Sequence, residues 1–163
     1  MAEPAAGRLW WAQRAKGAFR DDTPLRVSGR GRLAGARVFG DRGRLANPRG
    51  WRRPWPELTH LQRNSFVLRM LQVAAGEADL LVSLTPKAPW DLAPGLLFVE
   101  EAGGAVGAGG GRAIPLEDGR MIPGPIWASN ALLADEIAQR LAGRKQDGAT
   151  ARARGAAPRS EGQ

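Results

Sequence analysis

The fold is most constrained by residues 64–104, which predict a helix, a buried strand and a second helix in immediate succession. Asn64 can cap a helix over residues 65–75, whose apolar side chains recur with a period of about 3.6 residues until Gly76. Residues 79–84 are mostly apolar and predict a buried strand. This alternation is typical of α/β proteins, in which helices pack against the faces of a sheet.

The second helix is expected to begin at about Asp91 and to end at Gly103 and Gly104. Pro89 disfavours helical geometry at the residue before it, and Pro94 fits a first turn, where no backbone donor is needed. Asp91 is a lone carboxylate at the start of an otherwise apolar run. A buried carboxylate needs a cation or several hydrogen-bond donors, so Asp91 indicates a binding site, with a helix cap as the alternative.

The rest of the chain predicts short strands, irregular loops and one further helix. The expected strands are two within residues 8–20, then 36–39, 113–116 and 126–128. Residues 40–58 contain three prolines and residues 107–111 are rich in glycine, so both predict irregular loops. Ser129 or Asn130 can cap a last helix over about residues 131–142.

The composition limits the kinds of site that the chain can build. The sequence contains no cysteine, and His60 is its one histidine. Disulfides, thiolate zinc sites, cysteine nucleophiles and histidine-cluster metal sites are therefore excluded. Any bound metal ion must be held mainly by oxygen, which suits magnesium, manganese or calcium. No run of 18 apolar residues occurs and residues 1–20 lack the pattern of a secretory signal, so we expect a cytoplasmic protein with no membrane partner.

The positive charge is concentrated in one region. The 163 residues carry a net charge of +8, and the stretch from Arg26 to Arg53 contains nine arginines and a single acidic residue, Asp41. Such a stretch could bind nucleic acid, with Trp51 and Trp55 stacking on bases while arginines neutralise phosphates. We interpret it instead as an exposed basic loop, because no recognised nucleic-acid-binding motif accompanies the charge.

Two motifs point to a family. They are Trp90-Asp-Leu-Ala-Pro-Gly95 and, a few residues later, Glu101-Ala-Gly-Gly104. Together they resemble the second signature of the inositol monophosphatase family of metal-dependent phosphomonoesterases, which reads Trp-Asp-x-Ala-x-Gly and then Glu-Ala-Gly-Gly. Other segments resemble the family in the same order, from a hairpin at residues 4–19 to Ala128-Ser-Asn130. The resemblance covers residue 3 to about residue 142.

The resemblance implies a fold and a domain organisation. The family's fold is a layered αβαβα sandwich, and residues 1–142 match its C-terminal portion only. Residues 143–163 are rich in glycine, alanine and charge, so we expect them to form a disordered basic tail.

The resemblance also implies a chemistry, in which magnesium ions are bound and an activated water attacks the phosphorus of a small phosphorylated substrate. Asp91 matches the carboxylate that holds the second metal ion, near the leaving-group oxygen. Asn64, Ser65 and Phe66 match the helix start that contacts the alcohol portion of the substrate. Asn64 and Phe66 depart from the family pattern, which has glycine first and a small residue last. Ser83 falls near where inositol-specific enzymes carry a glutamate.

The family's first signature, Asp-Pro-Ile-Asp-Gly-Thr, does not occur in the 163 residues. The glutamate that precedes this signature in the family has no counterpart here either. In the family those residues supply most of the metal ligands and the threonine that activates water. Asp91 alone cannot hold two or three magnesium ions, which prefer several hard ligands. We therefore predict negligible phosphatase activity for this chain by itself, and we expect it to form a homodimer or to pair with a missing N-terminal half.

Other functions stay open beside this one. A 3′(2′),5′-bisphosphate nucleotidase-like phosphatase would suit a basic surface, a non-catalytic remnant would suit the absent ligands, and a nucleic-acid-binding module would use the arginines from Arg26 to Arg53. Lys87 is interpreted as a solvated loop lysine, with contact to a substrate phosphate as the alternative. His60 is interpreted as a surface residue without a catalytic role.

Overall fold

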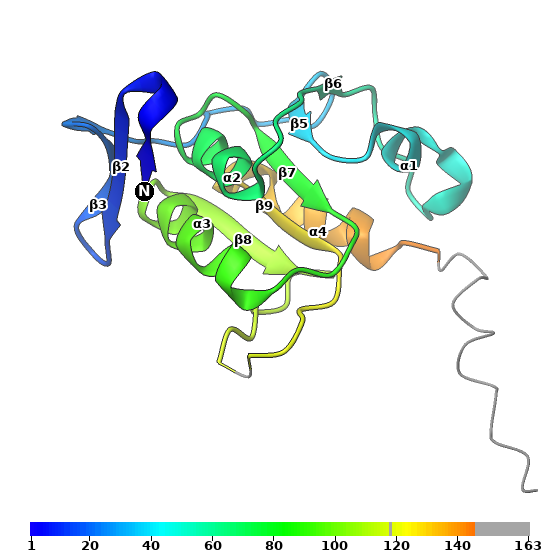
Figure 1. Ribbon diagram of the computed structural model, residues 1–163. Helices are drawn as coiled ribbons and strands as arrows, with labels where there is room; N and C mark the ends of the chain where they lie inside the picture. Colours follow the sequence, from blue (N-terminus) through cyan, green and yellow to red (C-terminus); the bar gives the residue numbers. More distant parts are fainter. Residues whose placement is uncertain (118, 146–163) are drawn as a thin grey trace, which may run out of the picture.

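The computed structural model describes residues 1–117 and 119–145 of the chain. In this part the chain builds four layers, which are a small antiparallel sheet, a pair of helices, a larger mixed sheet and a C-terminal helix (Figure 1). The strands are β1 (Ala2–Glu3), β2 (Arg8–Gln13), β3 (Gly17–Arg20), β4 (Thr23–Pro24), β5 (Arg37–Phe39), β6 (Thr59–His60), β7 (Leu80–Ser83), β8 (Gly104–Ala108) and β9 (Ile126–Asn130). The helices are α1 (Arg42–Ala46), α2 (Phe66–Ala74), α3 (Pro89–Glu101) and α4 (Ala134–Ala142), with short 3-10 turns at Pro4–Ala6, Pro48–Gly50 and Ala131–Leu133.

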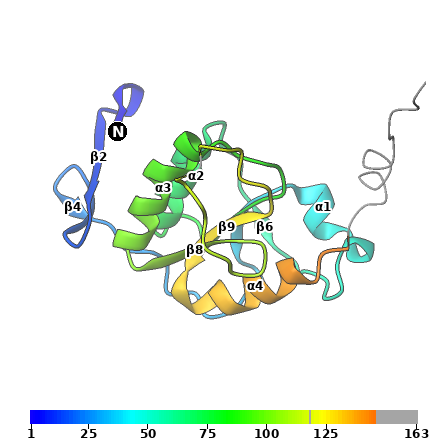
Figure 2. The ribbon, with the colours of Figure 1, turned by 90° about the horizontal axis from the view of Figure 1, so that it is seen from below.

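This arrangement confirms the predicted α/β sandwich. Figure 2 shows α2 and α3 between the small sheet and the larger sheet, with α4 on the far face of the larger sheet. The order of sheet, helix pair, sheet and helix corresponds to the last four layers of an αβαβα sandwich. Among residues 1–117 and 119–145, no helix covers the outer face of the small sheet.

The small sheet has the order β1-β2-β3-β4 and turns alternate side chains to opposite faces. Trp10 and Ala18 are buried in the core that this sheet shares with α3. On the opposite face Trp11 stacks on Phe19, with ring centroids 4.1 Å apart. Leu9 and Trp11 are 52% and 40% exposed. The outer face of the small sheet therefore carries apolar side chains that remain in contact with solvent.

The helices α2 and α3 pack closely against each other. A Cβ atom at Gly95 would lie 2.8 Å from the Cβ of Met70, so only glycine allows this approach. The far end of α3 holds the hairpin between β2 and β3, because the Glu101 carboxylate accepts hydrogen bonds from the N–H groups of Ala15 (2.8 Å) and Gly17 (2.9 Å). These two bonds lower the pKa of Glu101. An acid at the C-terminal end of a helix is unfavourable with respect to the helix dipole, and these two bonds explain why Glu101 is there.

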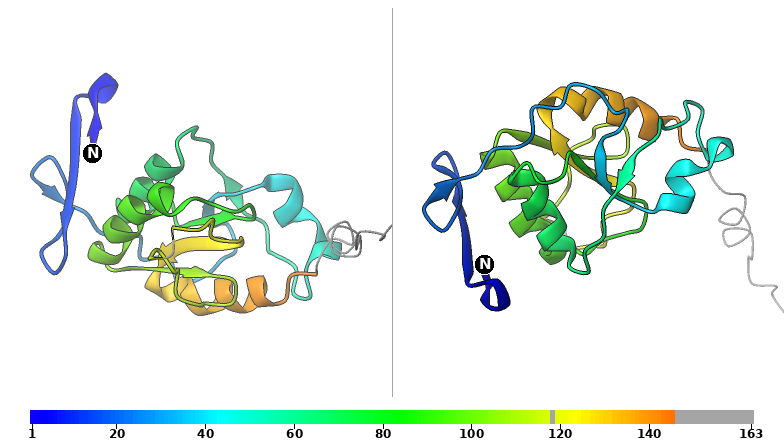
Figure 3. Two further views of the ribbon diagram at one scale, coloured as in Figure 1. Left: turned by 60° about the horizontal axis from the view of Figure 1, so that its bottom comes forward. Right: turned by 90° about the horizontal axis from the view of Figure 1, so that it is seen from above.

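The larger sheet has the order β6-β5-β7-β9-β8. Strands β6, β5 and β7 run parallel, whereas β9 runs antiparallel to both of its neighbours. All five residues of β9 are buried. The views in Figure 3 show α2 and α3 on one face of this sheet and α4 on the other, so apolar cores form on both sides of it.

Several predicted element boundaries need correction. The helix α2 is capped by Ser65 rather than Asn64, since the Ser65 hydroxyl accepts from the N–H of Leu68 at 3.3 Å. The helix α3 begins at Pro89 rather than Asp91, because a proline at the first helical position has the required φ and lacks only a donor that would be unpaired there.

Two predicted loops contain regular structure, and one predicted strand does not form. Within residues 40–58, α1 is stabilised by the Asp41 carboxylate, which accepts from the N–H of Arg44 at 2.9 Å. Within residues 107–111, Gly107 belongs to β8, and a Cβ there would overlap the Trp127 ring of β9. Residues 113–116 pair with no strand of the described part, although their apolar side chains still pack on the core.

The described part ends shortly after α4. Residues 143–145 of the predicted tail pair with the backbone of residues 50–52, through bonds of 2.8 Å from the Arg52 N–H to the Gly143 carbonyl and 3.0 Å from the Lys145 N–H to the Gly50 carbonyl. The remainder of that prediction, residues 146–163, lies outside the described residues. In the described part, no helix has the length and apolar character needed to cross a bilayer.

Candidate functional site

A cleft of about 670 Å³ opens where the parallel strands β5 and β7 end. In open α/β sheets the carboxyl ends of parallel strands are the usual place for ligands. The loops after β5 and β7 form two walls of this cleft, and the start of α2 forms a third. Its lining consists of residues 39–44, Asn64, Phe66, Arg69, residues 81–85 and Lys87.

The cleft is positively charged. Arg42, Arg44, Arg69 and Lys87 line it together with a single acid, Asp41. Asp41 is already engaged, because it caps α1 and lies 3.7 Å from the Arg44 guanidinium. The charges in the lining therefore favour an anionic ligand.

Lys87 is held over the cleft by its own loop. Its ammonium group donates to the Thr85 hydroxyl at 2.8 Å, and that hydroxyl lies 3.4 Å from the hydroxyl of Ser83. The same ammonium group lies 5.3 Å from the centroid of the Phe66 ring, a cation–π distance. Lys87 is thus half-buried in the wall of the cleft, where our interpretation of the sequence had placed a solvated loop lysine.

The structure brings two of the predicted substrate residues into the cleft. Asn64 and Phe66 both belong to its lining, one on each side of the residue that caps α2. Ser65 is exposed, does not line the cleft, and uses its hydroxyl for the cap. Ser83 also lines the cleft, at the end of β7.

Asp91 lies outside the lining of the cleft, in the first turn of α3. It is exposed rather than buried, so the cost of burying a charge does not explain its presence. It is not the helix cap either, because Ala88 occupies that position and no side chain caps α3. Within the described part no side-chain hydrogen bond or ion pair engages its carboxylate, and the neighbouring Trp90 is 70% exposed. Asp91 is therefore free to bind a group from outside the chain.

The described residues do not form a complete metal site. Among residues 1–117 and 119–145, no three histidine, aspartate or glutamate side chains lie close enough to share a metal ion. Magnesium demands near-octahedral coordination by several oxygen atoms, and Asp91 supplies one carboxylate. The residues present would hold a magnesium ion only with further donors.

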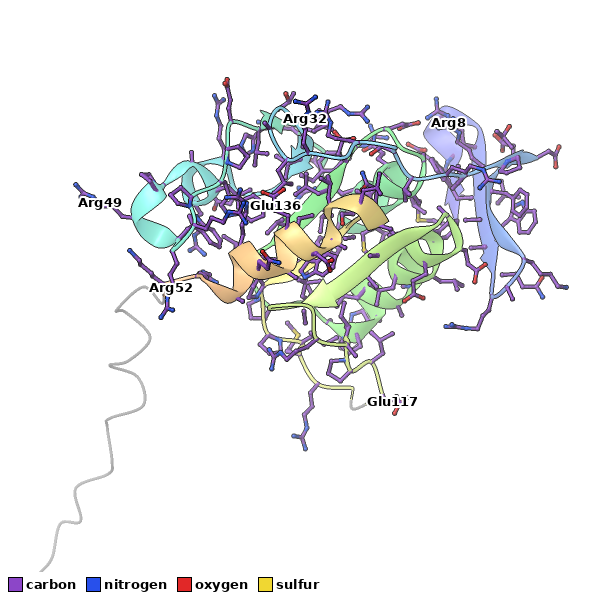
Figure 4. All side chains as sticks on the ribbon, turned by 180° about the vertical axis from the view of Figure 1, so that it is seen from behind. Arg8, Arg32, Arg49, Arg52, Glu117 and Glu136 are labelled. Carbon is purple, nitrogen blue, oxygen red and sulfur yellow. The ribbon has the colours of Figure 1, made fainter. Side chains whose placement is uncertain are left out.

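A second charged cluster serves the fold. Asp79 is 1% exposed and accepts from the Arg37 N–H (2.7 Å), from the Arg37 guanidinium (2.9 Å) and from the Arg30 guanidinium (3.0 Å). Of the arginine-rich stretch, Figure 4 labels Arg32 at the top of the molecule and Arg49 and Arg52 near α1, so these three side chains do not lie together.

Of the residues that the sequence singles out, Asn64 and Phe66 line the cleft and Asp91 does not, and the sequence did not predict the arginines of the cleft. Arg42 and Arg69 are far apart in the chain, and neither belongs to a recognised motif. A weak signal was available for Arg42, because it follows a predicted strand by a few residues. His60 belongs to β6 and does not line the cleft; burial lowers its pKa.

The comparisons with known proteins identify a family. The model of the inositol monophosphatase family matches residues 1–142. An inositol-1-monophosphatase of Mesorhizobium japonicum is 35% identical over an alignment of 138 residues that covers 80% of this chain and 51% of that protein. One from Rhizobium meliloti is 34% identical over an alignment of 148 residues that covers 84% of this chain and 53% of that protein. The chain thus spans about half the length of the curated relatives that it matches.

Solved structures show the same fold. The extragenic suppressor protein SuhB from Bartonella henselae has a TM-score of 0.64 and 27% identity, covering 85% of this chain and 55% of that one. The IMPase from Thermotoga maritima has a TM-score of 0.64 and 27% identity, covering 83% of this chain and 52% of that one. Since the family match spans nearly all of the described residues, this chain belongs to the inositol monophosphatase family.

Proposed function

We propose that this chain supplies the substrate cleft and one metal ligand, Asp91, of a magnesium-dependent phosphatase that hydrolyses small phosphate monoesters. The observation that supports the proposal is the basic cleft at the ends of β5 and β7, together with the exposed carboxylate of Asp91 in the first turn of α3. Cations in the cleft would attract a phosphorylated substrate, and Asp91 would be one of the oxygen donors for the metal ion. The family's magnesium ion would neutralise charge on the transferring phosphoryl group and on the departing oxygen.

We further propose that the remaining metal ligands come from outside these 163 residues. The sequence lacks the family's first signature, and the described residues gather no group of three metal-binding side chains. By itself the chain would then bind substrate weakly and turn over none of it. The relatives from Mesorhizobium japonicum and Rhizobium meliloti are named inositol-1-monophosphatases, so inositol 1-phosphate is the first substrate to test.

The outer face of the small sheet is the proposed contact for the polypeptide that completes the site. Leu9, Trp11 and Phe19 lie on this face, and no helix of the described part covers them. Exposed apolar side chains of this kind favour association with another chain or segment. The partner is either an N-terminal half of the same fold or a second copy of this chain. Light scattering of the pure chain separates the two, because a stable dimer is expected only in the second case.

The experiment for the activity itself uses the pure chain with magnesium and inositol 1-phosphate, measuring release of inorganic phosphate. We expect no turnover above that of the Asp91→Asn variant. Turnover that disappears both in Asp91→Asn and with a chelator would show that the chain alone holds a working metal site. That result would overturn the incomplete-site proposal while retaining Asp91 as a ligand.

A further inference from the structure

A separate pocket of about 410 Å³ opens at the edge of the larger sheet opposite to the cleft. Its lining consists of residues 28–32, Arg37 and Asp79. Arg37 is the first residue of β5 and Asp79 directly precedes β7, so this pocket lies where the two parallel strands begin, whereas the cleft lies where they end. The pocket and the cleft share no lining residue.

One wall of the pocket is the segment from Ser28 to Arg32, which is fixed against the end of β9. Asn130 is 1% exposed, and its side-chain amide donates to the Ser28 hydroxyl at 2.9 Å and to the Arg30 carbonyl at 3.1 Å. Within residues 1–117 and 119–145, the backbone N–H groups of Gly29 and Gly31 donate to no acceptor. The wall therefore keeps two unpaired backbone donors, which a ligand can satisfy.

The charges of the pocket do not balance. Three guanidinium groups line it, and Asp79 is the one carboxylate among them. Asp79 is 1% exposed and pairs with two of the three, Arg30 at 3.0 Å and Arg37 at 2.9 Å. Arg32 is exposed, and no carboxylate of the described residues lies within ion-pairing distance of it. The lining thus carries two positive charges in excess, which favours a ligand with two negative charges.

The two arginines that Asp79 holds keep donors for a ligand. Arg37 uses Nε and Nη2 for Asp79 and the Gly76 carbonyl, so in the described part its Nη1 group has no acceptor. Arg30 uses Nε for Asp79 and Nη1 for the Ala34 carbonyl, which leaves its Nη2 group. The side chains of Arg30 and Arg37 are 35% and 39% exposed, so they are accessible to a ligand. Because both are already held in place, a ligand would pay little to order them.

We propose that this pocket is an anion site that binds a phosphate dianion, either free or as part of a small organic monoester. Guanidinium groups present paired N–H donors that match the oxygen atoms of a phosphate. A dianion would neutralise the two excess charges, in which the negative charge of Asp79 is already counted, whereas a carboxylate ligand would neutralise one. The site uses neither Asp91 nor a metal ion, so the proposal is independent of the proposed function.

Nuclear magnetic resonance would locate the anion directly. We would titrate the isotope-labelled full chain in EDTA with inorganic phosphate, glycerol 3-phosphate and acetate at constant ionic strength, and follow the backbone amides of Gly29, Gly31 and Arg32. We expect saturable shifts with both phosphates, and the tighter of the two identifies the ligand as the free ion or a monoester. Acetate should bind at least about tenfold more weakly, because it carries one charge. Absence of saturable shifts at these amides would overturn the proposal, and so would acetate binding as tight as that of phosphate.

Substitution of Arg32 tests the charge without disturbing a contact of the fold. Arg32→Gln should weaken phosphate binding about fivefold to tenfold, and Arg32→Lys should weaken it less because the charge remains. Arg49→Gln is the matched control, since Arg49 is exposed, lines neither the pocket nor the cleft, and lies away from Arg32 in Figure 4. If Arg49→Gln weakens phosphate as much as Arg32→Gln does, the binding is diffuse attraction to a basic protein and the proposal fails.

The cleft requires a control of its own, because it is also basic. Arg69→Gln should leave the phosphate affinity measured at Gly29 and Gly31 unchanged, since Arg69 lines the cleft and not the pocket. A loss of affinity as large as that of Arg32→Gln would place the ion in the cleft and refute the proposal. Asp91→Asn should also leave this affinity unchanged, so a failure of the metal-ligand assignment would not imitate a failure of the anion site.

Discussion

Replacement of Asp79 by asparagine tests the electrostatic argument for the fold most quantitatively. Burial alone would raise the pKa of Asp79, but the hydrogen bonds from the Arg37 side chain and backbone, and one from Ser28, outweigh burial and lower the pKa from 3.8 to about 2. The carboxylate joins the start of β7 to β5, since it accepts the Arg37 N–H at 2.7 Å. Asp79→Asn keeps the shape of the side chain and removes its charge.

The shift of the pKa gives the size of the effect. A pKa lowered from 3.8 to about 2 corresponds to about 2 kcal/mol of stabilisation of the folded state at neutral pH. Because the folded-state pKa is the lower one, this contribution is complete above about pH 5 and is lost as the pH falls through about 2. Asp79→Asn should therefore cost about 2 kcal/mol at pH 7, and the cost should shrink toward zero near pH 2.

Urea unfolding of parent and variant, at pH 7 and at several pH values down to pH 2, measures this difference directly. Comparison at equal pH removes the general acid destabilisation that a protein of net charge +8 will show. A variant as stable as the parent at pH 7 would contradict the argument. So would a stability difference that stays constant down to pH 2, because it would show that the charge of Asp79 is not what stabilises the pairing.

Three further predictions concern the elements around the site. Ser65→Ala should cost about 1 kcal/mol in urea unfolding because it removes the cap of α2, whereas Asn64→Ala, the cap predicted from sequence, should cost much less; equal costs would contradict the assignment. Gly95→Ala should lower the free energy of unfolding by about 1–3 kcal/mol, because the added Cβ crowds Met70 of α2. An unchanged free energy of unfolding would show that the two helices can move apart without cost. Glu101→Gln should speed amide hydrogen exchange at Gly17, whose N–H the carboxylate accepts; unchanged exchange there would mean that the bond does not hold the hairpin.

Much of the fold could be predicted from the sequence, because local patterns determine its central elements. The helix over residues 66–74 has a clear apolar period, β7 is a continuous apolar run, and α3 ends at Glu101, two residues before the predicted end at Gly103. Elements whose residues are poor in intrinsic propensity were missed. The strand β8 contains Gly107 because Trp127 of its neighbour occupies the space of a side chain, which only the tertiary structure reveals.

The candidate site was predictable only where it rests on a contiguous motif. The resemblance located Asp91 and the start of α2, yet it did not indicate that Asp91 is exposed and lies outside the cleft. No sequence signal indicated Arg69, and Arg42 had only the weak signal of following a predicted strand. They meet because β5 and β7 are paired and α2 begins beside them, and no local pattern encodes that pairing.

The central claim is that Asp91 is a metal ligand in a site completed from outside this chain. The direct measurement replaces the matching half of the Mesorhizobium japonicum relative by residues 1–142 of this chain and follows magnesium-dependent phosphate release by the folded chimera. We predict turnover that Asp91→Asn reduces about 100-fold or more, with Arg49→Gln leaving it unchanged. A folded chimera whose turnover is the same with and without Asp91→Asn would contradict the claim.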